Sequence, residues 1–174
     1  MSDEERRRQF AEAFIAQARS DWQVYRLLSQ SVDIPSCHGL HYLQMTCEKL
    51  AKAYRLRDVA ADVNETITRH TGFTNFIGPF FLALKDEYVG KDAQLTRLIR
   101  ESRKLAREIE KMAPAIDRAA APENAEYPWE ANGRVTAPCN YSFPALSLLQ
   151  QSGGRAFLNF LQRALRDFEA LSIR

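Results

Sequence analysis

The segment from residue 37 to residue 57 gathers the side-chain types of this sequence that could do chemistry. Plotted as a helix at about 100° per residue, it has one face that carries two imidazoles, a carboxylate and two ammonium groups. The members of this polar face are His38, His41, Met45, Glu48, Lys49 and Lys52. These groups can move protons or hold a polar ligand, but the residue types alone do not name a reaction.

The opposite face of the same segment is apolar and should pack on the core. Its members are Leu40, Leu43, Cys47, Leu50 and Tyr54. A plain surface helix needs only scattered solvated residues on its second face, so an organised polar face indicates a role. One interpretation is a ligand pocket whose polar members are His41, Glu48 and Lys52. The other is a polar contact with a neighbouring helix or with another subunit.

The three histidines do not predict a metal site. His38 and His41 lie one helical turn apart and could bind one ion together, but Glu48 lies roughly 10 Å farther along the helix from His41. His70 stands alone near the start of a helical segment. Its role could be that of a structural residue, a helix cap or a catalytic base. We count it among the ligand-binding candidates, with the polar residues of the second helical segment. We expect neither a metal nor a cofactor.

A second candidate surface is a basic stripe between residues 91 and 112. Its members advance by three or four positions and fall within a sector of roughly 60–80°. They are Arg97, Arg100, Lys104, Arg107 and Lys111, with Arg103 beside them. This geometry could follow a phosphate backbone. The alternative is a solvated face in which Glu101 pairs with Lys104, and Glu108 pairs with Arg107 or Lys111.

Apolar residues recur at helical spacing in five segments. The first covers residues 3–29, and the second covers residues 37–57 with Ser36 as its N-cap. The third covers residues 64–88, with interruptions at Gly72 and at Gly78–Pro79. The fourth covers residues 91–112, and the fifth covers residues 144–171 with a break or kink at Gly153–Gly154.

The stretch between Pro114 and Pro144 is rich in proline and has few periodic apolar residues. We expect a short helix over residues 115–121, followed by an ordered loop. The aromatic residues that should pin this loop to the body are Tyr127, Trp129, Tyr141 and Phe143. No alternation typical of strands appears in the sequence.

The composition is that of one globular domain. The chain has 174 residues, of which 45% are hydrophobic and 26% are charged. We expect a single domain over residues 1–174, with residues 115–143 as a loop insertion before the last helix. The predicted fold is all-α, an antiparallel four- to five-helix up-and-down bundle. Because the net charge is only +2, any binding of nucleic acid would need a local patch.

The cysteines and the N-terminus indicate a cytoplasmic protein. Cys37, Cys47 and Cys139 are an odd number without a CxxC pair, which favours reduced thiols. The N-terminus is charged and lacks an apolar signal core. No apolar run approaches the roughly 18 residues that cross a bilayer, so we expect no membrane partner.

Several short motifs occur in a characteristic order. The first helical segment contains A-x-x-D at residues 18–21, and the second reads H-x-x-Q-M-x-C-E-K-L-A-K-A at residues 41–53. Thr-Arg-His follows at residues 68–70, and NAEYPW follows at residues 124–129. This order resembles the HEPN family (higher eukaryotes and prokaryotes nucleotide-binding), whose second helix carries Glu-Lys-x-x-Lys-Ala. The family's later Arg-Tyr-Pro loop is matched only in part, because Glu126 stands where the arginine would be.

The resemblance covers residues 10–171 and implies an all-α bundle, commonly homodimeric, that works with nucleotides or RNA. Many HEPN proteins are metal-independent ribonucleases with an Arg-x(4–6)-His motif. In them the histidine moves protons and the arginine meets the developing phosphate charge. Here the positions five to seven residues before the three histidines contain no arginine. These positions are 31–33, 34–36 and 63–65.

We therefore expect a HEPN-like nucleotide- or RNA-associated binding module without a catalytic set. One alternative is a diverged, toxin-like endoribonuclease that uses His41 or His70 with an arginine distant in sequence. The other is a protein-interaction partner in a toxin–antitoxin-type system. No nucleophile-elbow sequence is present, and Gly153–Gly154 lacks the lysine that follows a phosphate-binding glycine loop.

Overall fold

Helices make up most of the fold, which confirms the predicted all-α class. The structure, a computed structural model, describes residues 1–113 and 116–171. Its elements in chain order are α1 (Asp3–Leu28), α2 (Ser36–Arg55), α3 (Val63–Thr68), α4 (Phe73–Ala83), η1 (Lys85–Tyr88), α5 (Asp92–Glu110), β1 (Trp129–Ala131), β2 (Arg134–Thr136), η2 (Pro138–Asn140), α6 (Pro144–Gln150) and α7 (Ser152–Arg166). The 3-10 helices are marked η.

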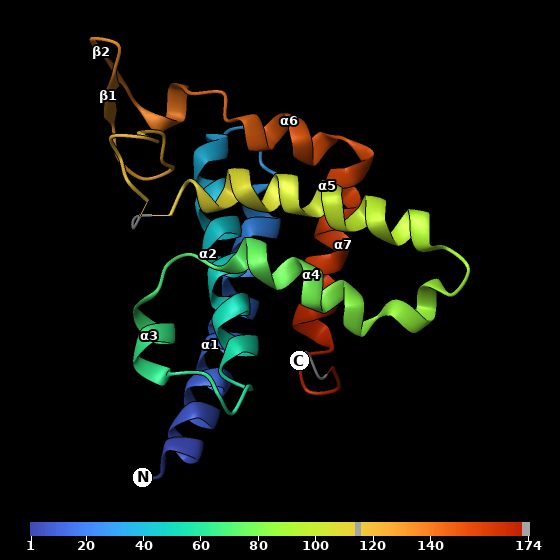
Figure 1. Cartoon of the computed structure of the whole chain (residues 1–174). Coiled ribbons are helices and arrows are strands. Elements are labelled where there is room, and N and C mark those ends of the chain that lie inside the picture. Colours follow the sequence, from blue (N-terminus) through green and yellow to red (C-terminus); the bar gives the residue numbers. More distant parts are fainter. Residues whose placement is uncertain (114–115, 172–174) are drawn as a thin grey trace.

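The helices α1 and α2 run side by side in opposite directions, whereas α4 and α5 cross this pair (Figure 1). Helix α1 begins where the Ser2 hydroxyl accepts a hydrogen bond from the Glu5 N–H at 3.2 Å, as an N-cap should. The predicted cap of α2 is wrong. Ser36 is the first residue of α2, and Pro35 is the N-cap and makes no side-chain cap bond.

The apolar faces of these helices meet in one core. The predicted apolar face of α2 is at most 3% exposed at Leu40, Leu43, Cys47, Leu50 and Tyr54. Aromatic rings of α4 and α7 fill the other side, where the ring centroids of Phe80 and Phe160 are 4.5 Å apart. Edge-to-face contacts of this kind add to the free energy gained from burial.

The third predicted helical segment is divided at one of its two expected interruptions. Gly72 separates α3 from α4 and has φ 131°, a conformation that favours glycine. The interruption expected at Gly78–Pro79 is wrong, because α4 continues through Pro79. Proline removes the hydrogen bond to the carbonyl of Asn75, but Asn75 is exposed, so water can replace that donor.

The connection before α6 differs from the prediction. Over residues 116–121 there is no helix, and residue 115 lies outside the described residues. Arg118 instead donates hydrogen bonds to several backbone carbonyls, including those of Ala113 at 2.7 Å and Glu123 at 2.9 Å. The unpredicted strands β1 and β2 form a hairpin whose turn, Asn132–Gly133, has φ 53° and 70°. An Asn-Gly pair is the strongest local signal for such a turn, and the sequence prediction missed it.

Three of the four predicted aromatic residues do pin this connection. Trp129 and Phe143 are buried, and the ring of Tyr141 lies 5.1 Å from that of Trp129 and 4.9 Å from that of Phe143. The prediction is wrong for Tyr127, which is 67% exposed.

The last predicted helical segment is divided into α6 and α7 as expected, but the break lies at Gln151, and Gly153–Gly154 belong to the first turn of α7. Gly154 is required for close approach, because a Cβ there would lie 2.2 Å from the carbonyl oxygen of Leu149. All three cysteines are free thiols. Among the described residues, no helix is long and apolar enough to cross a membrane.

Candidate functional site

Glu48 and Lys52 form a nearly buried ion pair on α2. The Lys52 Nζ lies 2.8 Å from Glu48 Oε1, and each side chain is 8% exposed. Gln44 donates to the second carboxylate oxygen at 3.0 Å, and Lys52 donates to the carbonyl of Ile67 at 3.0 Å. The Lys52 ammonium also lies 5.4 Å from the centroid of the Phe14 ring. An ion pair can be accommodated away from water when its remaining hydrogen-bonding positions are filled in this way.

His70 completes this cluster from a different part of the chain. Its Nδ1 lies 3.0 Å from Glu48 Oε1, and its side chain is 45% exposed. The end of α3 and the segment after it are therefore attached to α2 at two points, through Ile67 and through His70. Because Nδ1 faces the carboxylate, Nε2 is the ring nitrogen left to meet a ligand.

Lys49 has a different role from its neighbours on α2. Its Nζ lies 2.5 Å from Asp21 Oδ2 on α1, and the Asp21 side chain is 6% exposed. Gln17 donates to the other carboxylate oxygen of Asp21 at 3.1 Å. Lys49 therefore joins α2 to α1. This contact agrees with the interpretation in which the polar face packs on a neighbouring helix.

The two histidines at the start of α2 lie apart from the Glu48 cluster. The Nδ1 of His41 is 3.1 Å from Glu126 Oε1, and both side chains are 28% exposed. His38 is exposed. Residues 41 and 48 are about two helical turns apart, so one small ligand cannot contact both side chains easily.

A cavity of ≈ 340 Å³ opens between α2, α3 and α4. Of the candidates from the polar face, Glu48 and Lys52 line it and His41 does not. Its walls also include the buried rings of Tyr54, Phe73 and Phe76. A mostly apolar concavity with a few charged groups is the usual form of a small-molecule site.

Two arginines line this cavity that the sequence prediction did not single out. Arg55 and Arg69 both contact the Glu65 carboxylate, at 3.5 and 3.3 Å, and the three side chains are 44–54% exposed. Exposed pairs of this kind contribute little to stability, so either guanidinium can turn towards a ligand. The available signals were weak: Arg55 follows Lys52 by one turn, and Arg69 precedes His70.

The N-terminus of α4 is closed by a side chain of α5. Glu110 accepts hydrogen bonds from the N–H groups of Gly72 and Phe73, and from the Thr74 hydroxyl at 2.7 Å. A carboxylate at this position is favoured by the positive end of the helix dipole. It fixes the loop that forms part of the cavity wall and occupies the first amides of α4.

The basic stripe of α5 is only partly neutralised. All five members are exposed. The expected pair of Glu101 with Lys104 is wrong, because Arg100 reaches that carboxylate at 3.2 Å instead. Glu108 pairs with Lys111 at 2.7 Å, which is one of the two partners expected for it. Over residues 1–113 and 116–171, the remaining three members make no ion pair: Arg97, Lys104 and Arg107.

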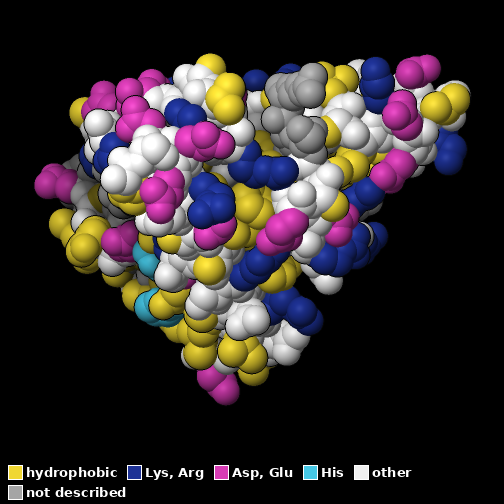
Figure 2. Space-filling view, turned by 90° about the horizontal axis from the view of Figure 1, so that it is seen from below, with side chains coloured by type: hydrophobic (Ala, Val, Ile, Leu, Met, Phe, Trp, Pro, Cys, Tyr) yellow, Lys and Arg dark blue, Asp and Glu magenta, His cyan; other side chains and the backbone are white. Residues whose placement is uncertain are grey.

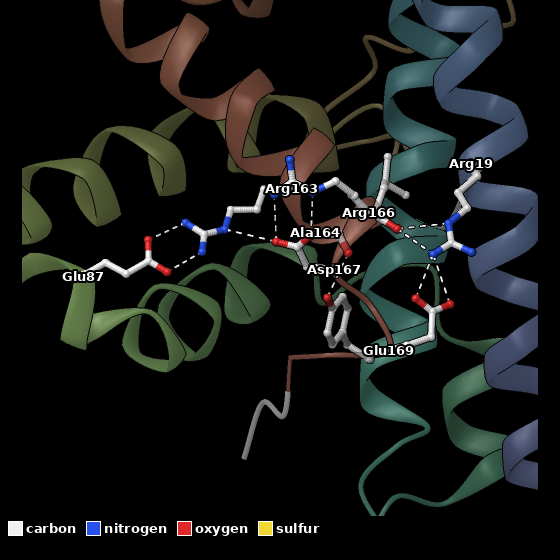
Figure 3. Close-up of polar contacts among 9 residues, drawn as sticks. Arg19, Glu87, Arg163, Ala164, Arg166, Asp167 and Glu169 are labelled. Carbon is white, nitrogen blue, oxygen red and sulfur yellow. Dashed lines mark hydrogen bonds and ion pairs between the residues drawn. The ribbon is translucent and has the colours of Figure 1, made fainter.

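Carboxylates with a clearly lowered pKa lie elsewhere, around the C-terminal end of α7, and Figure 3 shows their polar contacts. The hydrogen-bonded Arg163 guanidinium lowers the pKa of Glu87, and the bound Arg166 lowers the pKa of Asp167. Arg19 of α1 donates to the carbonyl of Leu165 at 3.0 and 2.8 Å. These contacts tie α7 to α1 and η1, so they hold helices together outside the cavity.

The surface as a whole does not identify a ligand. On the face in Figure 2, basic side chains are interspersed with acidic ones, which agrees with the small net charge. Among the described residues, no three His, Cys, Asp or Glu side chains are grouped to hold a metal ion. Comparisons with family models, curated proteins and solved structures find no match.

Proposed function

We propose that this protein is a HEPN-like nucleotide-binding module and that its ligand occupies the cavity between α2, α3 and α4. The observation that carries the proposal is the pairing of Arg55 and Arg69 at the edge of a concavity with an aromatic wall. The volume, ≈ 340 Å³, lies at the lower end of the usual range of about 300–1,000 Å³ for small-molecule pockets. That size suits a mononucleotide.

The chemistry of the lining residues assigns an orientation to the ligand. A phosphate group would displace Glu65 from Arg55 and Arg69, because a guanidinium binds phosphate through two parallel hydrogen bonds. The base would lie towards the apolar wall, where Phe76 and Pro79 supply surface and Asn75 supplies an amide. The buried Glu48–Lys52 pair would form the inner end of the site.

Calorimetric titration of the protein with each of the four ribonucleoside monophosphates tests this proposal. We expect saturable binding that weakens by about tenfold or more in Arg55→Ala and in Arg69→Ala, as for a lost hydrogen bond to a charged group. Arg8→Ala is the matched control, because Arg8 is an exposed arginine paired with Glu12 on α1. The proposal fails if no nucleotide binds, or if the Arg8→Ala variant loses as much affinity as the cavity variants.

One observation favours a second function, a diverged metal-independent endoribonuclease. The buried carboxylate of Glu48 orients the imidazole of His70, and Arg69 is its neighbour in the chain. A carboxylate that orients a histidine, with an arginine nearby, is an arrangement for proton transfer at a phosphate ester. The arginine that HEPN ribonucleases carry at a fixed spacing before the histidine is absent here, however, so we retain the binding module as the proposed function.

A further inference from the structure

A second concavity lies on another side of the protein, between α5 and the junction of α6 with α7. Its volume is ≈ 560 Å³. The lining residues include Arg97, Arg100, Glu101, Ser102, Ser152 and Gly153. It shares no lining residue with the cavity assigned to nucleotides, so the two sites can be tested independently.

The N-terminus of α7 opens into this groove without a side-chain cap. Helix α7 has 15 residues, its N-cap Gln151 makes no side-chain cap bond, and its first turn contains no acidic residue. The N–H groups of Gly154 and Arg155 donate to the carbonyl of Gln151. Those of Ser152 and Gly153 have no acceptor in the described part of the chain. These two amides are therefore left to meet a ligand, although the Glu101 carboxylate lies close to this positive end of the helix dipole, with its Oε2 3.8 Å from a Cβ built on Gly153.

Glycine at position 153 allows this helix end to approach α5 closely. A Cβ at Gly153 would lie 3.3 Å from the Cβ of Glu101, which is tighter than an ordinary contact. The close approach places the first amides of α7 in the same groove as Arg97 and Arg100 of α5.

Ser102 supplies an independent indication of a ligand. It is 1% exposed, it lines the groove, and its Oγ has no hydrogen-bond partner in the described residues. A helical serine can satisfy itself on the carbonyl one turn back, but this one does not. A buried hydroxyl without a partner destabilises a fold, so a missing acceptor is the simplest explanation for its retention.

We propose that this groove binds a phosphate group. Its oxygens accept hydrogen bonds from the amides of Ser152 and Gly153, from Arg97 and Arg100, and from the Ser102 hydroxyl. The Glu101 carboxylate, 3.2 Å from Arg100 and 37% exposed, competes with the phosphate for that guanidinium. The phosphate belongs either to a small molecule or to the phosphodiester backbone of single-stranded RNA.

Nuclear magnetic resonance with inorganic phosphate as the probe tests the site on the full chain. The amide signals of Ser152 and Gly153 should shift in a saturable manner. Arg97→Ala should weaken binding by about tenfold or more, and Ser102→Ala by about two- to tenfold. The Ser102→Ala variant should melt no lower than the parent, since it removes an unpartnered hydroxyl. Glu101→Gln should tighten binding because it removes the competing charge.

Two exposed residues of α5 that lie outside the groove, Arg107 and Thr96, provide control variants. Arg107→Ala removes the same charge as Arg97→Ala, and Thr96→Ala removes a hydroxyl as Ser102→Ala does. The proposal is overturned if neither amide shifts, or if a control weakens binding as much as its partner variant. A labelled single-stranded RNA, followed by anisotropy, identifies the source of the phosphate. RNA that displaces inorganic phosphate indicates a backbone, and RNA that does not bind indicates a small molecule.

Discussion

His70 Nδ1 lies 3.0 Å from Oε1 of Glu48, although 22 positions separate the two residues in the chain. The same oxygen receives the ammonium of Lys52 at 2.8 Å. Glu48 and Lys52 are almost inaccessible, whereas the His70 side chain is 45% exposed. The His70 imidazole therefore lies between the buried Glu48–Lys52 ion pair and the solvent. The contact also holds the segment after α3 against α2, next to the cavity between α2, α3 and α4.

The first prediction concerns the Glu48–Lys52 pair. Glu48→Gln leaves the Lys52 ammonium buried without an opposite charge, so we expect a loss of about 3 kcal/mol in the free energy of unfolding. Urea denaturation measures it. In the double variant Glu48→Gln/Lys52→Met the unpaired charge is gone, and the loss should be smaller than the sum of the two single losses by about 1 kcal/mol or more.

Glu12→Gln provides the comparison for the ion-pair prediction. Glu12 pairs with Arg8 on the surface of α1, and its side chain is 66% exposed. A change of about 0.5 kcal/mol or less is expected there. Equal effects of Glu12→Gln and Glu48→Gln would contradict the view that burial makes the Glu48 pair important.

The second prediction concerns the hydroxyl of Tyr54, which donates to the carbonyl of Ala164 at 2.9 Å in a buried position. Tyr54→Phe leaves that carbonyl without this donor and should lower the free energy of unfolding by about 1–3 kcal/mol. Tyr127→Phe is the control, because Tyr127 is 67% exposed and should change stability by less than about 0.5 kcal/mol. Indistinguishable melting curves for the two variants would mean that the buried hydrogen bond contributes nothing.

Part of this architecture follows from the sequence, because it depends on local periodicity. The apolar face of α2 is buried as its 3.6-residue period predicts, and Glu48 and Lys52 share a face for the same reason. The role of Arg55 and Arg69 could not be predicted in this way. Their meeting at Glu65 depends on the turn after α2, which brings α3 back along α2, and such tertiary geometry has no periodic signature.

Two other differences have distinct physical causes. The hairpin at Asn132–Gly133 was predictable in principle, since strands this short carry no alternation but the turn residues are diagnostic. The continuation of α4 through Pro79 could not be predicted from the local sequence. The helix packs Phe76, Ile77 and Phe80 into the core, and that burial outweighs the loss of one backbone hydrogen bond.

The third prediction concerns acid stability at the C-terminal end of α7. Arg163 lowers the pKa of Glu87 from its ordinary value of 4.5, so the ion pair stabilises the fold fully above that value. As the pH falls below 4.5 towards the lowered pKa, this contribution is lost. Because the Glu87 side chain is 49% exposed, solvent screening limits the effect to less than about 1 kcal/mol.

Thermal melting of the parent and of Glu87→Gln between pH 3 and pH 7 measures this contribution. The two curves should differ at neutral pH and converge in acid, where the parent carboxylate is protonated. Asp86→Asn removes a neighbouring exposed carboxylate on η1 that makes no ion pair among the described residues, so it should leave the melting temperature nearly unchanged over this pH range. A gap between parent and Glu87→Gln that stays constant down to pH 3 contradicts the assignment.

The fourth prediction concerns oligomeric state. The HEPN resemblance implies a symmetric dimer, whose two subunits would use the same surface. The polar face of α2 is occupied within the chain by Asp21 and His70, so such a dimer would have to use another surface. Light scattering at micromolar concentration should give twice the chain mass of 19.9 kDa. A mass equal to that of one chain counts against the dimer.

The last prediction separates the binding module from the ribonuclease. We expect no cleavage of single-stranded RNA by the protein in the presence of a chelator. The sequence lacks an arginine at the required spacing before any histidine. In HEPN ribonucleases that arginine meets the developing phosphate charge, so without it at that position the transition state would be poorly stabilised.

The assay distinguishes a true activity from a contaminant by comparing two histidine variants. His70→Ala removes the imidazole that Glu48 orients, whereas His38→Ala removes an exposed imidazole outside the cavity. Cleavage that persists in His38→Ala and disappears in His70→Ala would establish the ribonuclease and displace the binding module. Glu48→Gln should then reduce the rate as well, because the imidazole would lose the carboxylate that orients it. Cleavage that survives in both histidine variants and also in His41→Ala would instead come from another protein in the preparation.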